Sequence, residues 1–219
     1  MENTKTSLWE KTKKLIREVV IIVLGVTISI WFTDRYNHSK EQDDVKTFLR
    51  DLKEELKLDT TNLKSSKNAL IKNYAGNLFL ENLTEAVIDS LHKVKGTVNF
   101  NSDFTTTKIN DGNYEGFKMS GKIGTIENKK LKKLTLQYYQ NTVPSLVELE
   151  KFSRTQFFDI LNFIQNDAEK DLKKTFLNKK FKELLVFYNK TTKSMDGCYD
   201  QMLKEAEEIM TEIDKAVGK

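Results

Sequence analysis

The apolar positions of the chain form one continuous run near the N-terminus, followed by a series of amphipathic stretches. Residues 19–32 read VVIIVLGVTISIWF and carry no charge. Fourteen helical residues cover about 21 Å, less than the ~30 Å hydrocarbon core of a bilayer, but Leu15 and Ile16 extend the run by a turn. Trp9 and Trp31 are 22 residues apart, about 33 Å along a helix, which matches the separation of two interfacial aromatic belts.

This run predicts a single transmembrane helix over residues 14–33. The predicted membrane anchors are Trp9, Arg17, Trp31, Phe32 and Tyr36, with Arg17 reaching toward the nearer interface. Two other interpretations stay open. A cleaved signal peptide has a charged start and an apolar stretch of this length, but WFTDRYN stands where a small-residue cleavage site is needed. The third is a buried helix of a soluble domain, although VVIIVLGV offers no polar face.

Basic residues flank the run unequally, with five before it and three within about 15 residues after it. Lys and Arg concentrate on the cytoplasmic side of membrane proteins. The sequence therefore predicts a cell inner-membrane protein with a cytoplasmic tail, residues 1–13, and an extracytoplasmic domain, residues 34–219. The basic residues are Lys5, Lys11, Lys13, Lys14 and Arg17 before the run, and Arg35, Lys40 and Lys46 after it.

Behind the run, apolar residues recur at spacings of three, four and seven, which is typical of amphipathic helices. The first of these helices begins near Glu41 and is expected to bend at Gly76, and a second is expected to end near Gly96. The stripe of the first helix is Val45, Leu49, Leu52, Leu56, Leu63, Leu70 and Tyr74.

The stretch 97–116 lacks a helical period and is rich in Asn, Asp, Thr and Gly, so it predicts a loop. Phe100 and Phe104 are expected to pin this loop to the helices. The next residues, 116–122, fit the pattern GxxxxGK of a phosphate-binding loop. Because Ile123 stands where that loop needs Ser or Thr, and no strand precedes it, a turn between helices is the favoured interpretation.

Two longer helices complete the pattern. One begins after Asn128, a suitable N-cap, and contains Pro144, which should kink or divide it. The last helix has apolar positions alternating four and three residues apart for nearly five heptads, as in a coiled-coil seam. This seam is Phe181, Leu185, Tyr188, Thr192, Met195, Tyr199, Met202, Ala206, Ile209 and Ile213. The sequence thus predicts an all-α fold, a transmembrane helix continuing into a bundle of about four long helices.

The composition supports helices and excludes several classes of site. Of the 219 residues, 31% are charged, nine are Gly and one is Pro, too few turn residues for an all-β fold. A single cysteine, Cys198, excludes an intramolecular disulfide, and the two histidines, His38 and His92, leave little for metal binding. We therefore expect no catalytic, metal or cofactor site. A net charge of +4 from 36 basic and 32 acidic residues gives no reason to expect nucleic acid as a partner.

One basic cluster is a candidate anion-binding patch, although a solvated helix face is the favoured interpretation. Its members are Lys118, Lys122, Lys129, Lys130, Lys132 and Lys133.

Two further features predict self-association. Gly25 and Ser29 form a small-xxx-small face that allows membrane helices to approach closely. Outside the membrane, Tyr199 and Met202 lie on the seam of the last helix. An ordinary bundle helix is the simpler interpretation of this seam, and the further hypothesis is that it binds a second copy.

Two blocks of the chain resemble a known family. The first block, REVVIIVLGVTISIWFTDRYNHSKEQDDVKTFLRDLKEELKLD, places an acidic residue ahead of an aliphatic run with a central Gly, followed by a Trp-containing stretch and a charged Leu-rich helix. NYEGFKMSGKIGTIENKKLKKLTLQYY joins a Tyr-containing turn, Ser-Gly-Lys and a helix ending in paired tyrosines. Both blocks resemble small single-span membrane-anchored helical proteins common in Bacteroidota, with Trp-Phe-Thr-Asp here in place of their usual Asn-Trp-Asn. The resemblance implies one membrane span and a helical domain, and it brings no catalytic residues. Matching positions are Glu18, Gly25, Trp31, Tyr114, Ser120, Gly121, Ile126, Leu131, Tyr138 and Tyr139.

These observations favour a non-enzymatic membrane protein that acts by self-association and by contact with an unidentified membrane or extracytoplasmic protein. The alternative is a ligand-sensing helical bundle that signals through a partner membrane protein. A hydrolase or transferase is the least favoured class, since no nucleophile motif or spaced pair of catalytic carboxylates is evident.

Overall fold

The computed structural model describes residues 3–94, 97–167 and 171–218. Helices account for most of these ranges and no described residue belongs to a strand, so the predicted all-α fold is confirmed. The packing divides the chain into two units, Met1–Thr47 and Phe48–Lys219. The first helix, α1 (Asn3–Glu81), contributes to both units, which are described separately below.

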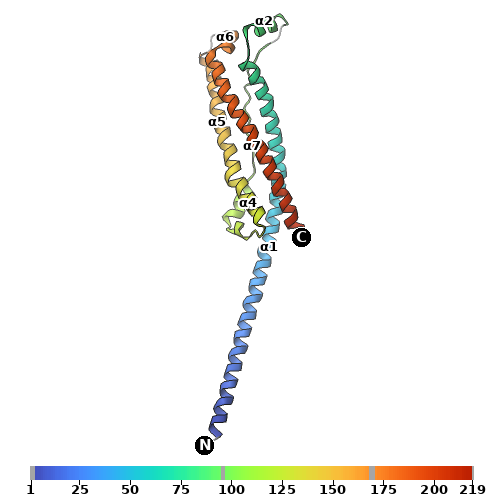
Figure 1. Cartoon of the computed structure of the whole chain (residues 1–219), viewed down its shortest axis with the longest axis vertical. Coiled ribbons are helices and arrows are strands. Elements are labelled where there is room, and N and C mark those ends of the chain that lie inside the picture. The colour runs from blue at the N-terminus through green and yellow to red at the C-terminus, as the bar shows by residue number, and fades with distance from the viewer. Residues whose placement is uncertain (1–2, 95–96, 168–170, 219) are drawn as a thin grey trace. The chain divides into compact units, whose positions relative to one another are not determined.

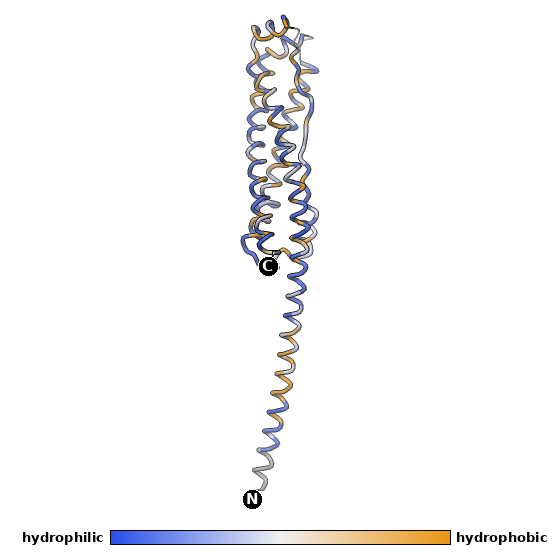
Figure 2. Tube along the Cα trace, turned by 90° about the vertical axis from the view of Figure 1, so that its right-hand side faces the viewer, coloured by the Kyte–Doolittle hydropathy of each residue, from blue (hydrophilic) through white to orange (hydrophobic). Residues whose placement is uncertain are grey.

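The first unit consists of the N-terminal part of α1. Its most apolar window has a mean hydropathy of 2.2, and none of that window is buried in the structure. Figure 2 shows this stretch as a hydrophobic segment of α1. Within the described residues, α1 is the one helix that is long and apolar enough to cross a membrane.

The second unit is a bundle built on three long helical stretches (Figure 1). These are the remainder of α1, the stretch from α4 to η3, and α7. The elements after α1 are α2 (Glu85–Lys93), α3 (Gly112–Met119), the 3-10 turn η1 (Lys122–Thr125), α4 (Lys129–Gln137), the π-helical turn η2 (Tyr138–Thr142), α5 (Val143–Asn162), the π-helical turn η3 (Phe163–Asp167), α6 (Leu172–Leu177) and α7 (Lys179–Val217).

Helix α7 lies beside both other long stretches and runs antiparallel to them. Its C-terminal end is joined to α1 by the ion pair of Lys53 with Asp214. At its other end, Asn189 donates a hydrogen bond from Nδ2 to Oε2 of Glu81 at 2.7 Å. Helices α5 and α7 are the most extensively packed pair among the described elements. The regular seam of α7 faces this interior, and all ten of its residues are buried.

An extended segment packs beside the three long helical stretches, where a fourth helix would lie in a four-helix bundle. We call residues 97–111 the strap, and it runs antiparallel to α1. Asn101 donates to Asn73 at 2.7 Å, and the backbone N–H of Asn110 donates to Asp59 at 3.1 Å. An extended residue advances up to about 3.3 Å and a helical residue 1.5 Å. The strap therefore needs fewer residues, from Asn101 to Asn110, to run beside the longer stretch of α1 from Asn73 to Asp59.

The strap corrects the predicted number of long helices. The second helix expected to end near Gly96 is the nine-residue α2, and residues 95–96 lie outside the described part of the chain. Helix α1 continues through Gly76 to Glu81, so the helix does not end at the glycine where a bend was expected. A β-carbon at Gly76 would meet nothing within 4 Å, which shows that no close approach requires glycine there.

The two boundary residues of the next helical stretch act as predicted. Asn128 caps α4, since its Oδ1 accepts the N–H of Leu131 at 3.0 Å. Pro144 lies in the first turn of α5, directly after the π-helical turn Tyr138–Thr142. A proline has no N–H to donate and clashes with the preceding turn of an α-helix. The wider π turn lets the chain continue without that clash, and it divides the stretch into α4 and α5.

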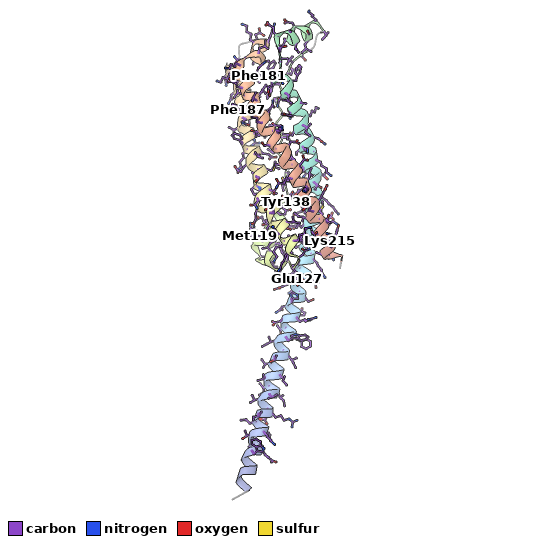
Figure 3. All side chains as sticks on the ribbon, in the orientation of Figure 1. Met119, Glu127, Tyr138, Phe181, Phe187 and Lys215 are labelled. Carbon is purple, nitrogen blue, oxygen red and sulfur yellow. The ribbon has the colours of Figure 1, made fainter. Side chains whose placement is uncertain are left out.

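Aromatic rings pin the strap to the core, as the sequence predicts. The rings of Phe100 and Phe104 lie 5.8 and 5.3 Å from that of Phe157 on α5. Figure 3 labels Phe181 and Tyr138, which belong to the upper and lower parts of the core in that view. The predicted loop is shorter than 97–116, because α3 already begins at Gly112.

Candidate functional site

The predicted membrane anchors are exposed in the first unit. The large apolar side chains from Val19 to Phe32 are 49% to 64% exposed, and they lie on all sides of α1. The aromatic rings at the two ends lie beside basic groups. Nζ of Lys13 lies 5.1 Å from the centre of the Trp9 ring, and the Arg35 guanidinium lies 5.7 Å from that of Trp31. Arg17 and Tyr36 are also exposed.

The hydroxyl groups of the apolar run donate to the backbone one turn earlier. Ser29 donates to the carbonyl of Gly25 at 2.8 Å, and Thr27 donates to that of Val23 at 2.8 Å. In hydrocarbon these bonds remove the cost of an unsatisfied polar group. At 100° per residue, Glu18 falls on the same face as Gly25 and Ser29, while Thr27 lies opposite.

The predicted intermolecular seam on α7 is wrong for this fold. Tyr199 and Met202 are 1% and 0% exposed, so the single chain already covers them. The Tyr199 hydroxyl lies 2.7 Å from Oγ1 of Thr107 and 3.2 Å from a carboxylate oxygen of Glu150. The physical reason is that other elements of the same chain cover the seam, since α4 and α5 pack against α7 and Thr107 of the strap meets Tyr199.

The structure brings together only part of the predicted anion-binding patch. Lys118 pairs with Glu115 at 3.1 Å, and Lys130 pairs with Glu212 at 2.9 Å. Lys122 belongs to η1. The remaining three lysines line one shallow hollow of about 320 Å³ on the outer face of α4 and η2. Its lining residues are Lys129, Lys132, Lys133, Leu136, Gln137, Gln140 and Asn141.

We expect Lys130→Gln to raise the pKa of Glu212. Hydrogen bonds from Lys215 and Lys130 lower the pKa of this carboxyl from 4.5 to about 2. Because the folded pKa is lowered, ionised Glu212 stabilises the fold above pH 4.5, and this contribution is lost as the pH falls toward 2. An NMR titration of the carboxyl measures the shift, and Lys133→Gln is the control. A pKa that stays near 2 in Lys130→Gln contradicts the assignment.

The sequence interpretation missed the most unusual feature of the domain, a row of carboxyl groups beneath the strap. Asp59 is 0% exposed and accepts both the backbone N–H and the Nδ2 of Asn110, at 3.1 and 2.7 Å. Glu150 is 7% exposed and accepts the N–H of Thr107 at 2.9 Å. Asn113 bonds to Glu55, one turn before Asp59.

A signal for this row exists in the sequence. Asp59 stands in the apolar stripe of its helix, four residues before Leu63 and three after Leu56. Glu150 stands in the same way between Leu146 and Ser153. Polar residues on an apolar stripe must find buried hydrogen-bond partners, because an unpaired buried polar group destabilises the fold.

A cluster of three tyrosines adjoins the row of carboxyl groups. The Tyr139 ring stacks on Tyr114 at 4.4 Å and meets Tyr138 edge-on at 4.9 Å. The hydroxyl oxygens of Tyr138 and Tyr139 are buried, and no hydrogen-bond partner is found for either within the described residues. Burial raises the pKa of both phenols well above the usual value of 10.

A cavity large enough for one water molecule lies higher along the strap. It measures about 20 Å³ and adjoins Phe104, Ser153 and Tyr188. The Ser153 hydroxyl is buried in this wall and lies next to the Tyr188 hydroxyl, with which it interacts. A cavity of this size with polar walls fits one bridging water.

The described residues contain no group of three His, Cys, Asp or Glu side chains that is arranged to hold a metal ion. Cys198 is half-buried, and burial raises the pKa of its thiol. His38 is exposed, and the side chain of His92 lies outside the described part.

Comparison with protein-family models, curated proteins and solved structures finds no match for this chain. The resemblance to membrane-anchored Bacteroidota proteins therefore stays a prediction from the two sequence blocks.

Proposed function

We propose that this chain is a non-catalytic, single-pass membrane protein that displays its helical bundle for protein contacts and self-associates through its membrane helix. The observation that carries the proposal is the exposure of the apolar run on every side of α1. Fourteen uncharged residues exposed to water would be strongly unfavourable, at roughly 25 cal/mol per Å² of apolar surface. Lipid removes that penalty, and the basic excess before residue 19 supports a cytoplasmic N-terminus.

The face that contains Glu18, Gly25 and Ser29 supports self-association. Glycine and serine allow two helix backbones to approach closely. In lipid there is no hydrophobic driving force for helix association, so such close packing is what stabilises a pair of helices. Glu18 lies near one end of the run and on the same face. A carboxyl group in this position avoids lipid best when its face is covered by a second helix.

The bundle also has aromatic side chains available for contact. Phe152 and Phe158 on α5 and Phe187 on α7 are 51% to 60% exposed. Phe187 lines a surface hollow of about 350 Å³ with Leu177 and Val186. Exposed aromatic rings next to a hollow are common features of protein interaction surfaces.

One experiment on the full-length chain tests both parts of this proposal. Membranes are washed with alkaline carbonate and then treated with a crosslinker. We expect the wild type to stay in the membrane pellet and to crosslink as a homo-oligomer. Gly25→Leu should stay in the pellet but lose most of the crosslinked species, because a leucine side chain separates the two backbones.

The matched control is Thr27→Leu, which places the same side chain on the opposite face of the helix. It should leave crosslinking unchanged. Release of the wild type by carbonate would disprove the membrane anchor. Equal crosslinking of Gly25→Leu and Thr27→Leu would show that self-association does not use this face.

A further inference from the structure

We propose that the strap, residues 97–111, is a proton-sensitive latch, held most tightly when the Asp59 carboxyl beneath it is neutral and loosened as Asp59 ionises. This device is independent of the membrane function proposed above. It rests on the contacts of the strap, on the charges around them and on the burial of the groups involved.

The carboxyl row holds the strap at regular intervals. Backbone or side-chain amides of every third residue, Thr107, Asn110 and Asn113, donate to acids on the long helices. The acceptors are Glu150, Asp59 and Glu55 respectively. The lower part of the strap and the start of α3 are therefore attached to the bundle through carboxyl oxygens.

The charges that act on Asp59 are themselves acidic. Glu55 lies one turn earlier on α1, and Asp111 lies at the end of the strap. From η2, the buried phenols of Tyr138 and Tyr139 face the same carboxyl. Repulsion between carboxylates and removal from water both disfavour the ionised state. The phenols are neutral over the whole physiological pH range and compensate no charge.

Glu55 has the same kind of surroundings. Asp111 and Asp51 act on it with like charge, and burial raises its pKa above the usual 4.5. One of its two carboxylate oxygens is buried, and no hydrogen-bond partner for that oxygen is found among the described residues. Burial in such a place costs a protonated carboxyl less free energy of hydration than it costs a carboxylate.

The pKa of Asp59 gives the direction of the coupling. Burial raises it from 3.8 to about 6, although the hydrogen bonds from Asn110 lower it. When the strap lifts, water reaches the carboxyl and its pKa returns toward 3.8. The docked strap thus binds the proton more tightly than the lifted strap. By linkage, lifting becomes easier as the pH rises through the interval from about 4 to about 6.

The upper part of the strap is attached differently. Phe100 and Phe104 pack against Phe157, the Arg154 guanidinium lies 5.7 Å from the Phe104 ring, and Asn101 bonds to Asn73. These contacts include no carboxyl group. A change of pH should therefore act on residues 105–111 and leave residues 98–104 in place.

Hydrogen exchange of the full-length chain in detergent micelles tests the latch. Exchange is compared at pH 5.0 and 7.5 after correction for the intrinsic rates. We expect the amides of Thr107 and Asn110 to exchange about tenfold faster at pH 7.5, the ratio that linkage gives for a carboxyl that titrates near 6 when docked and near 4 when free. Peptides covering residues 98–104 should show no such ratio.

Asp59→Asn is the informative variant, because asparagine is neutral at both pH values and keeps one carbonyl acceptor for the Asn110 N–H. It should show the same protection at pH 5.0 and 7.5. Asp159→Asn, which changes an exposed acid on α5, is the matched control and should behave as the wild type. Circular dichroism establishes that both variants are folded.

Two results would overturn the latch. One is equal protection of Thr107 and Asn110 at both pH values in the wild type. The other is a tenfold ratio that persists in Asp59→Asn. Should that variant fail to fold, Glu55→Gln provides the test, since removal of its charge must shift the midpoint of the wild-type transition to lower pH. An unshifted midpoint would contradict the proposal.

Discussion

Met202→Asp is expected to unfold the helical bundle of the second unit. The side chain of Met202 is 0% exposed, between the long helices of the second unit. Burying a carboxylate away from water at this site costs about 4 kcal/mol or more and removes most of the stability of an ordinary domain. Thermal denaturation followed by far-UV circular dichroism should show that the cooperative transition of the bundle is lost.

Gln201→Asp is the control, because it adds the same charge at the exposed neighbouring residue. Its transition should lie within a few degrees of the wild type. A different result is expected if the α7 seam packs against a second copy of the chain and not inside its own bundle. In that case Met202→Asp would stay folded and only its mass in detergent would fall, and such a result would show that the core described above is incorrect.

Phe157→Ala is expected to have the second-largest effect. The Phe157 ring is 3% exposed and lies among four other rings, those of Phe100, Phe104, Phe158 and Tyr188. Truncating a buried phenylalanine destabilises a domain by about 3–5 kcal/mol. Two of the four rings belong to the strap, so residues 98–104 should also lose their protection from hydrogen exchange.

The adjacent residue provides the control. Phe158 is 51% exposed, and Phe158→Ala should change stability by no more than about 1 kcal/mol. Denaturant unfolding monitored by circular dichroism is the suitable measurement. Both tryptophans lie in the first unit, so their fluorescence does not report on the bundle. Similar losses in the two variants would mean that Phe157 does not organise the upper strap.

The helical stripes were predictable because their period is local. Leu52, Leu56 and Leu63 are all fully buried at the positions that the spacing assigns to the core. Asn128 was predictable for the same reason, since an N-cap bonds to a residue three positions away.

The strap and its carboxyl row were not predictable in the same way. An extended segment that bonds to side chains has neither the helical nor the strand period. Thr107 meets its partners 43 and 92 residues away in the sequence, on α5 and on α7. Only the folded chain places these residues together. The interpretation of the α7 seam as intermolecular failed for a similar reason, because nothing local shows which elements of the same chain cover it.

The long-range contacts of the bundle also determine how late in synthesis the domain can fold. Thr107 requires Tyr199, and Lys53 requires Asp214, which follows it by 161 residues. Contacts of such sequence separation form late, because a long loop must close first. As the ribosome adds α2 to α6, the apolar stripe of α1 and the acids beside it have no lasting cover. Only the arrival of α7 closes the bundle over them, so the segment up to about Asp214 must be made before this domain gains its full stability.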